Sequence, residues 1–439
     1  MKLNELKSKI KKNMPIYQKL LAQIIKVPSI KGEALENAPF GRETREALRQ
    51  GLEIANHQFG LKTQQLDNKI GWAELTGNDN NYIAALGHLD VVDAPKQGWK
   101  TPPFDLTIRE GYMYGRGVLD NKGPIMGALF ALALLKDEGF EPKQTIRVIF
   151  GTDEESGSSD MKTYNAIEKA PLAGFTPDGK YPVVYAERGM LRLSLIANIN
   201  DGSDKILSKI EGDFSPSYIP DKVDVTFSSG VVKTYSGEKS PSNAPDLGKN
   251  ALLELAQEQK KLPGQIGKIM AWLYRATNDS KGKGLKIAFD GEKSGELQCS
   301  VYGFEFNNNQ IKINFSIRYP IELAKRKLLE QLKTQLPKDS QLVINRDIAP
   351  LYHDPEAPII KTMQKTYEEV TGLKGTPVTT TGITYARFLP NTVAFGPSFP
   401  GQRGIAHKEN EWLKVSDWEK IIAIEYLTLK RLAEREYKL

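Results

Sequence analysis

Residues 82–92 read YIAALGHLDVV, an apolar run of strand length that ends in polar residues. Residues 123–135 read GPIMGALFALALL, which is apolar almost all round, and residues 145–157 read TIRVIFGTDEESG, a second apolar run that leads into acidic residues. Strand, helix and strand in this order predict a βαβ unit of an α/β fold. Because the crevice of such an open sheet lies beyond the carboxyl ends of its strands, we expect the polar residues after both strands to meet at one edge.

The rest of the chain predicts a second domain inside the first. Short alternating strands such as LRLSLIANI and IKINFSIRYP follow residue 187, and this texture is typical of a separate α+β domain. A chain of 439 residues is also longer than one hydrophobic core usually serves. We expect a first domain made of residues 1–187 and 348–439, interrupted by an inserted domain of residues 188–347. Helices are expected over residues 17–27, 44–59, 250–259, 321–336, 357–371 and 416–435.

Composition narrows the class of protein. The net charge of +6 is spread along the chain, and its one basic cluster, residues 7–12, lacks interleaved aromatics, so we expect no nucleic-acid partner. Cys299 is the only cysteine, which fits a reducing compartment. No cleavable leader pattern and no run of eighteen apolar residues occurs, so we expect a cytoplasmic protein with no membrane partner.

The residues after the two strands are typical of a two-metal site. His88 can bind one ion, and Asp90, two residues further along the strand, can accept its second ring N–H and fix the tautomer. Asp120, in the polar turn GRGVLDNKG, is placed to bridge two ions. Glu154 and Glu155 are adjacent and therefore cannot share one role, so one can bind a metal while the other takes a proton from water.

Each of these residues also has a structural interpretation. A histidine at a strand end is more often structural than a ligand, the acidic turn is commonly a solvated one, and Asp120 could cap the helix that follows. Their joint position at one sheet edge favours a metal site. The sequence has no GxSxG nucleophile motif and no GxxxxGK[ST] phosphate loop, and Cys299 lies inside an expected strand, which argues against covalent hydrolysis and nucleotide chemistry.

Five motifs, GHLDVV, GRGVLDNKG, GTDEESG, FTPDGKYPVVYAERG and GIAHKENEW, resemble in order and spacing those of the aminoacylase/carboxypeptidase G family of co-catalytic zinc metallopeptidases. The branch that the chain resembles is that of the PepV-type dipeptidases, also described as Xaa-His dipeptidases or carnosinases. The resemblance covers essentially the whole chain. It implies an α/β catalytic domain with a mixed, largely parallel sheet flanked by helices, and an inserted α+β lid domain.

The resemblance also implies a role for each matching residue. His88 and Asp178 would bind one zinc ion, Glu155 and His407 the other, and Asp120 would bridge them. Manganese or cobalt would suit the same carboxylates and imidazoles.

Further matches assign the remaining chemistry. Glu154 would be the general acid and base, Asp90 would orient the first histidine ligand, and Arg318 would grip the substrate carboxylate or its polarised carbonyl. Gly382 and Thr384 match the family's substrate loop. The implied reaction is hydrolysis of a dipeptide through a metal-bound hydroxide that Glu154 generates, in a chain that we expect to be a monomer.

The lid departs from the family pattern. Pro241 stands where the family usually has a histidine that stabilises the oxyanion, and proline offers no donor; loss of one such donor typically costs ~10²–10³ in rate. Ser217 stands where an asparagine is usual, and Ile383 replaces the second of two glycines. Three interpretations follow: a dipeptidase, a related N-acyl amino acid amidohydrolase, and a catalytically silent metal-binding paralogue.

Overall fold

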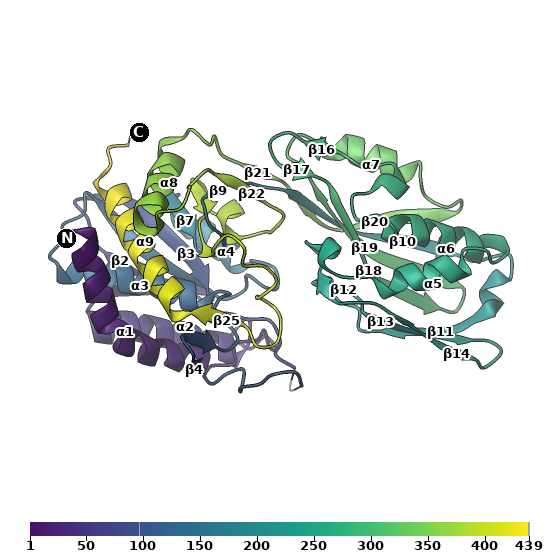
Figure 1. The fold of residues 1–439 in the computed structure, drawn as a ribbon, viewed down its shortest axis with the longest axis horizontal. Coiled ribbons are helices and arrows are strands. Elements are labelled where there is room, and N and C mark those ends of the chain that lie inside the picture. The colour runs from purple at the N-terminus through teal and green to yellow at the C-terminus, as the bar shows by residue number, and fades with distance from the viewer. Residues whose placement is uncertain (96, 438–439) are drawn as a thin grey trace. The chain divides into compact units, whose positions relative to one another are not determined.

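The computed structural model describes residues 1–95 and 97–437, and the chain divides into two compact units (Figure 1). Unit 1 comprises Met1–Tyr185, His353–Val378 and Ile383–Leu439, and unit 2 comprises Ala186–Tyr352 and Thr379–Gly382. Each unit has its own hydrophobic core.

A nine-stranded sheet forms the centre of the larger unit. Its strands follow the order β1-β2-β6-β3-β7-β23-β9-β21, and β22 pairs with β9. The pairs β6–β3, β3–β7 and β7–β23 are parallel, whereas the flanking pairs are antiparallel. The bounds are β1 (Lys62–Leu66), β2 (Ile70–Leu75), β3 (Asp79–His88), β6 (Gln144–Gly151), β7 (Ala173–Thr176), β9 (Val184–Glu187), β21 (Leu351–Tyr352), β22 (Val378–Thr380) and β23 (Thr392–Ala394).

Helices cover this sheet, and α3 is the one that positions the site. It is apolar almost all round, and it packs against strands β3 and β6 and against helices α1 and α9. The helices of unit 1 are α1 (Leu3–Ile25), α2 (Arg42–Glu53), α3 (Lys122–Asp137), α4 (Asp160–Ile167), α8 (Pro358–Thr371) and α9 (Val415–Glu434). Small strands complete it: β4 (Thr107–Arg109), β5 (Tyr112–Tyr114), β8 (Gly179–Lys180), β24 (Pro397–Ser398) and β25 (Trp412–Lys414).

Unit 2 is an α+β arrangement. Its main sheet is antiparallel, in the order β18-β19-β10-β20, and a three-stranded sheet has the order β11-β13-β14. The strands are β10 (Gly189–Asn198), β11 (Leu207–Gly212), β12 (Tyr218–Ile219), β13 (Lys222–Phe227), β14 (Val232–Ser236), β15 (Ser240–Pro241), β16 (Asp290–Gly291), β17 (Gly295–Glu296), β18 (Gln298–Asn307), β19 (Gln310–Tyr319) and β20 (Ser340–Ile348). The helices are α5 (Ala251–Gln259), α6 (Gly264–Thr277) and α7 (Lys325–Lys333).

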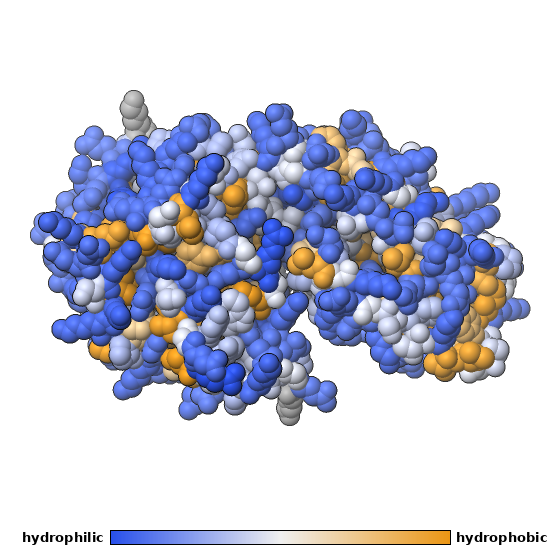
Figure 2. Space-filling view, in the orientation of Figure 1, coloured by the Kyte–Doolittle hydropathy of each residue, from blue (hydrophilic) through white to orange (hydrophobic). Residues whose placement is uncertain are grey.

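Element boundaries differ from the sequence prediction at several places. The helix expected over residues 44–59 is α2 followed by one π-helical turn, Ile54–Gln58. Helix α6 was not predicted, because its two glycines break the helical pattern while its apolar face is buried in the core of unit 2. In the part of the chain that the structure describes, no helix is both long and apolar enough to cross a membrane. On the face that Figure 2 shows, apolar side chains form small groups within a mostly hydrophilic surface.

Candidate metal centre

The parallel strands bring the expected ligands together. Strands β3 and β6 are in register at His88 and Gly151, so the end of β3 lies beside the turn that carries Glu154 and Glu155. Strand β7, on the other side of β3, leads into Asp178. Parallel strands end at one edge of the sheet, and the polar residues that follow them therefore meet there.

One group of side chains gathers around His88, which is fully buried. Its Nε2 lies 3.2 Å from Oδ1 of Asp120 and 3.7 Å from Oδ2 of Asp178. His88, Glu154 and Asp178 each offer a ligand atom within 4.8 Å of the others, and so do His88, Asp120 and Glu155. Imidazole and carboxylate donors at these separations suit a divalent transition-metal ion.

A second group forms around His407, which lies in the loop before β25. Its Nε2 is 2.9 Å from Oε1 of Glu155 and 3.1 Å from Oδ2 of Asp120. The two carboxylate oxygens of Asp120 therefore face different imidazoles, Oδ1 toward His88 and Oδ2 toward His407. A carboxylate in this position can bridge two ions.

Asp90 contacts both the histidine and the acidic turn. The ring Nδ1 of His88 lies 2.9 Å from the backbone carbonyl oxygen of Asp90, and 3.4 Å from its carboxylate Oδ1. The carboxylate accepts hydrogen bonds from the backbone N–H groups of Glu154, at 3.2 Å, and Glu155, at 3.0 Å. Asp90 thus holds the imidazole mainly through its main chain and the two glutamates through its side chain.

Asn121 is a supporting residue that the sequence did not single out. Its Oδ1 accepts from the backbone N–H of His88 at 3.2 Å, and its Nδ2 donates to the carbonyl oxygen of Pro177 at 2.6 Å. It therefore ties β3 to the residue that precedes Asp178. The only signal in the sequence is its place directly after Asp120 in a polar turn.

The charges of the cluster are what a cation site requires. Burial and the charge of Asp178 raise the pKa of Glu154 well above its ordinary value, and burial and Asp120 do the same for Asp178. Burial alone would lower the pKa of His88 and His407, but their carboxylate neighbours raise it well above the usual range. Buried carboxylates that repel one another are stabilised by a bound cation, so the donor set fits one or two divalent ions.

The lid residues of the prediction lie in other parts of the chain. Arg318 is buried in β19 of unit 2, and Gly382 belongs to the short Thr379–Gly382 segment of the same unit. Thr384 belongs to unit 1, where its hydroxyl accepts from the backbone N–H of Ala386.

Ser217 and Pro241, two of the three positions that depart from the family pattern, lie close together. Strands β12 and β15 pair with Tyr218 opposite Pro241, and the N–H of Ser242 donates to the carbonyl oxygen of Ser217 at 2.9 Å.

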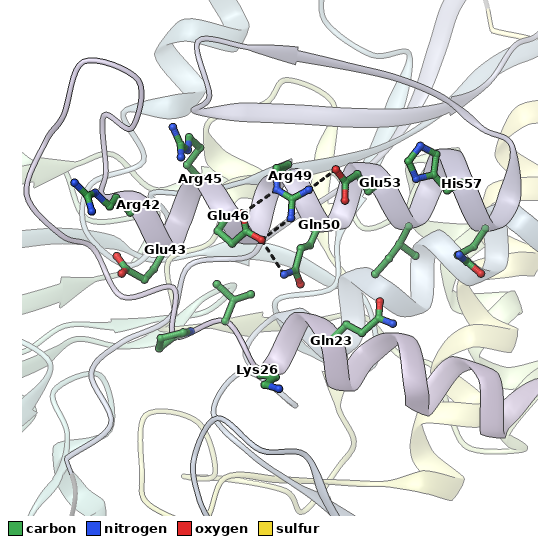
Figure 3. Close-up of a pocket in the computed structure, with 14 residues that line it drawn as sticks. Gln23, Lys26, Arg42, Glu43, Arg45, Glu46, Arg49, Gln50, Glu53 and His57 are labelled. Atoms are coloured by element: carbon green, nitrogen blue, oxygen red, sulfur yellow. Dashed lines mark hydrogen bonds and ion pairs between the residues drawn. The ribbon is translucent and has the colours of Figure 1, made fainter.

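A groove of about 780 Å³ lies elsewhere in unit 1, between the end of α1 and α2 (Figure 3). Among the described residues that line it there is no member of the metal cluster. Arg49 donates to Glu46 and Glu53 along the same helix, so its charge is already paired. His57 lines this groove and lies apart from the cluster, and we assign it no chemistry.

Comparison with known proteins identifies the family. A model described as peptidase family M20/M25/M40 matches residues 84–431. The chain is 29% identical over 432 residues to the putative dipeptidase YtjP of Bacillus subtilis (strain 168). The alignment covers 90% of this chain and 92% of the relative. It is 28% identical over 442 residues to the beta-Ala-Xaa dipeptidase of Lactobacillus delbrueckii subsp. lactis. This alignment covers 92% of this chain and 93% of the relative. The family that the five sequence motifs predicted is confirmed.

Solved structures share the fold. The di-peptidase Dug1p of Saccharomyces cerevisiae matches with a TM-score of 0.65 at 18% identity, over 99% of each chain. Human carnosine dipeptidase 1 matches with a TM-score of 0.63 at 14% identity, over 98% of this chain and 100% of that chain. At these identities the likeness concerns the fold, and the predicted fold class is confirmed.

Proposed function

The chain belongs to peptidase family M20/M25/M40, and on that premise we propose that it is a metal-dependent dipeptidase acting on small peptides. The observation that carries the proposal is the position of Asp120, whose two oxygens face His88 and His407. A carboxylate shared between two imidazole-bearing sites is the arrangement that a pair of divalent ions requires. The family implies divalent metal as cofactor, and we propose two ions, zinc first, with manganese or cobalt as the alternatives.

The ligands divide into two sets around this shared carboxylate. We assign His88 and Asp178 to one ion, Glu155 and His407 to the other, and Asp120 to both. The short distances within each pair support this division. Bound ions would polarise the scissile carbonyl and lower the pKa of the attacking water.

Glu154 is the residue that moves the proton. Its backbone is held by Asp90, and its carboxyl lies in the acidic cluster, where burial and neighbouring charge raise its pKa. A carboxylate with a raised pKa can take a proton from water as the C–O bond forms and deliver it to the amine as the C–N bond breaks. Glu154 is also near enough to His88 and Asp178 to bind metal, so its role needs a direct test.

Unit 2 supplies the substrate-binding lid in this proposal. We assign Arg318, whose planar guanidinium suits a carboxylate, to the carboxyl end of the peptide, and Gly382 and Thr384 to the family's substrate loop. The lid corresponds to the inserted residues 188–347. Because one chain carries both the site and its lid, we propose a monomer, and the single buried cysteine supports a cytoplasmic location.

The deciding experiment measures amino-acid release from a panel of dipeptides and N-acyl amino acids. Protein freed of metal is tested alone and with Zn²⁺, Mn²⁺ or Co²⁺. We expect metal-dependent cleavage of dipeptides. Cleavage confined to N-acyl amino acids would make the protein an amidohydrolase, and metal binding without turnover would make it a binding protein.

Two variants distinguish the role of a metal ligand from that of the general base. Glu154→Gln is expected to keep the metal content and to lose ~10²–10⁴ in kcat, whereas His88→Ala is expected to lose metal. Glu434→Gln, an exposed change on α9, serves as the control. Loss of metal in Glu154→Gln would show that this carboxylate is a ligand and would refute its role as the base.

A further inference from the structure

Glu411 is a buried carboxylate that the proposed reaction does not use. Its Oε1 accepts hydrogen bonds from three backbone N–H groups, those of Gly117 at 3.1 Å, Leu119 at 2.9 Å and Asp120 at 3.1 Å. Its Oε2 accepts from Nη1 of Arg116 at 2.8 Å. The side chain is completely excluded from solvent, so these four donors replace its water. One carboxylate thus organises the whole loop that carries Asp120.

Arg116, the partner of Glu411, makes further contacts of its own. It is buried, its guanidinium lies 5.3 Å from the centre of the Trp99 ring, and Nη2 donates to the carbonyl oxygen of Asp93 at 3.1 Å. Charge-assisted hydrogen bonds in a buried setting restrict the positions that Glu411 and Arg116 can take. The Glu411–Arg116 pair therefore fixes the loop that carries Asp120.

The same residue also fixes the loop of the second histidine. Glu411 follows His407 by four residues, and its carbonyl oxygen accepts from the N–H of Gly115 at 3.2 Å, just before β25 pairs with β5. Asn410 secures the other side of this short segment, because its Oδ1 accepts from the N–H of Lys100 at 2.7 Å. His407 therefore belongs to a segment whose C-terminal end is hydrogen-bonded directly to the loop that carries Asp120.

We propose that Glu411 is a positioning residue that sets the Asp120 carboxylate relative to His407, and thereby determines how tightly the chain holds its second metal ion. The inference rests on the proposed two-ion function. Asp120 would serve both ions, but only His407 and Glu155 would complete the second site. A shift of Asp120 relative to His407 changes the second site most, because these two of its ligands come from separate loops that Glu411 joins.

The test measures metal binding rather than turnover. Zn²⁺ is titrated into metal-free protein against a chromophoric chelator, and the visible spectrum of the Co²⁺-loaded protein reports the ligand geometry. In Glu411→Gln the amide nitrogen cannot accept a hydrogen bond, so the side chain cannot serve Arg116 and the three N–H groups together. We expect the weaker of two Zn²⁺ ions to bind ~10–100-fold more weakly and the Co²⁺ spectrum to change.

A matched control and a second variant keep the test decisive. Glu425→Gln makes the same change at another fully buried glutamate, on α9, and is expected to leave both affinities unchanged. If Glu411→Gln does not fold because Arg116 is left unpaired, Glu411→Asp keeps the charge but shortens the reach, and the same loss is expected.

Two results are distinguishable. Wild-type affinities and an unchanged Co²⁺ spectrum in a folded Glu411 variant would overturn the inference. Wild-type protein that binds two ions but cleaves no peptide would refute the proposed function and leave the role of Glu411 standing.

Discussion

The buried carboxyl of Glu425 gives a prediction that does not depend on metal. Glu425 lies on α9 at its contact with α3, and a Cβ built on Gly127 of α3 would lie only 2.7 Å from its Oε2. Neither carboxylate oxygen has a hydrogen-bond partner among the described residues. Burial therefore raises the pKa of Glu425 well above its ordinary value of 4.5. We expect the folded protein to keep this carboxyl protonated at pH values between the ordinary and the raised pKa.

The sign and size of the pH effect on the free energy of unfolding follow from proton linkage. Between the ordinary pKa and the raised pKa, the folded chain binds one proton that the unfolded chain has released, so the free energy of unfolding falls as pH rises. The slope is about 1.4 kcal/mol per pH unit for one proton. Below the ordinary pKa this contribution is fully present, and it is lost as pH rises through the folded pKa. Glu425→Gln cannot ionise, so the variant is expected to gain stability relative to wild type at this rate.

Urea unfolding of metal-free protein between roughly pH 5 and pH 8 measures the difference. Tryptophan fluorescence reports mainly on unit 1, which holds every tryptophan except Trp272. Other buried acids, such as Asp160 with its pKa raised to about 7, contribute equally to both proteins and cancel. Glu434→Gln, exposed on the same helix, is expected to follow wild type. Parallel stability curves for wild type and Glu425→Gln would refute the reasoning.

Two further changes test how the site loops are supported. Lys122→Met removes the side-chain nitrogen that donates to the carbonyl oxygens of Ile24 at 3.1 Å and Val27 at 2.7 Å. We expect this change to lower the free energy of unfolding by about 1–3 kcal/mol, measured by urea unfolding. Gly87→Ala places a Cβ 2.3 Å from Oδ1 of Asn121, so the Asn121 side chain must move. We expect weaker Zn²⁺ binding in the chelator titration. Binding as tight as that of the wild type would contradict the supporting role of the Asn121 amide.

The sequence predicted the large features of the fold because their signals are local. The apolar run that ends at His88 and the run that ends before Glu154 are continuous in the chain, and the handedness and edge rules of α/β sheets then place them together. The remaining proposed ligands, Asp178 and His407, were predicted through the family resemblance alone, since no spacing rule joins residues so far apart in sequence.

The supporting contacts could not be predicted in the same way. Glu411 and the N–H groups that it binds are separated by more than 290 positions, and a hydrogen bond over that distance leaves no periodic pattern in the sequence. Asn121 stands next to a predicted ligand, but its bond to the carbonyl of Pro177 depends on how β3 and β7 pair. Such contacts arise from tertiary packing, which propensity and patterning do not encode locally.

Three glutamates show what the structure adds to the sequence. Glu411 is satisfied by four protein donors, and its charge is matched by Arg116. Glu154 lies among like charges, which a bound cation would offset. Glu425 has neither, so protonation is the remaining way to reduce the cost of its burial. In our proposals the same residue type thus positions a loop, transfers a proton or sets a pH dependence, and the groups around each carboxylate decide which.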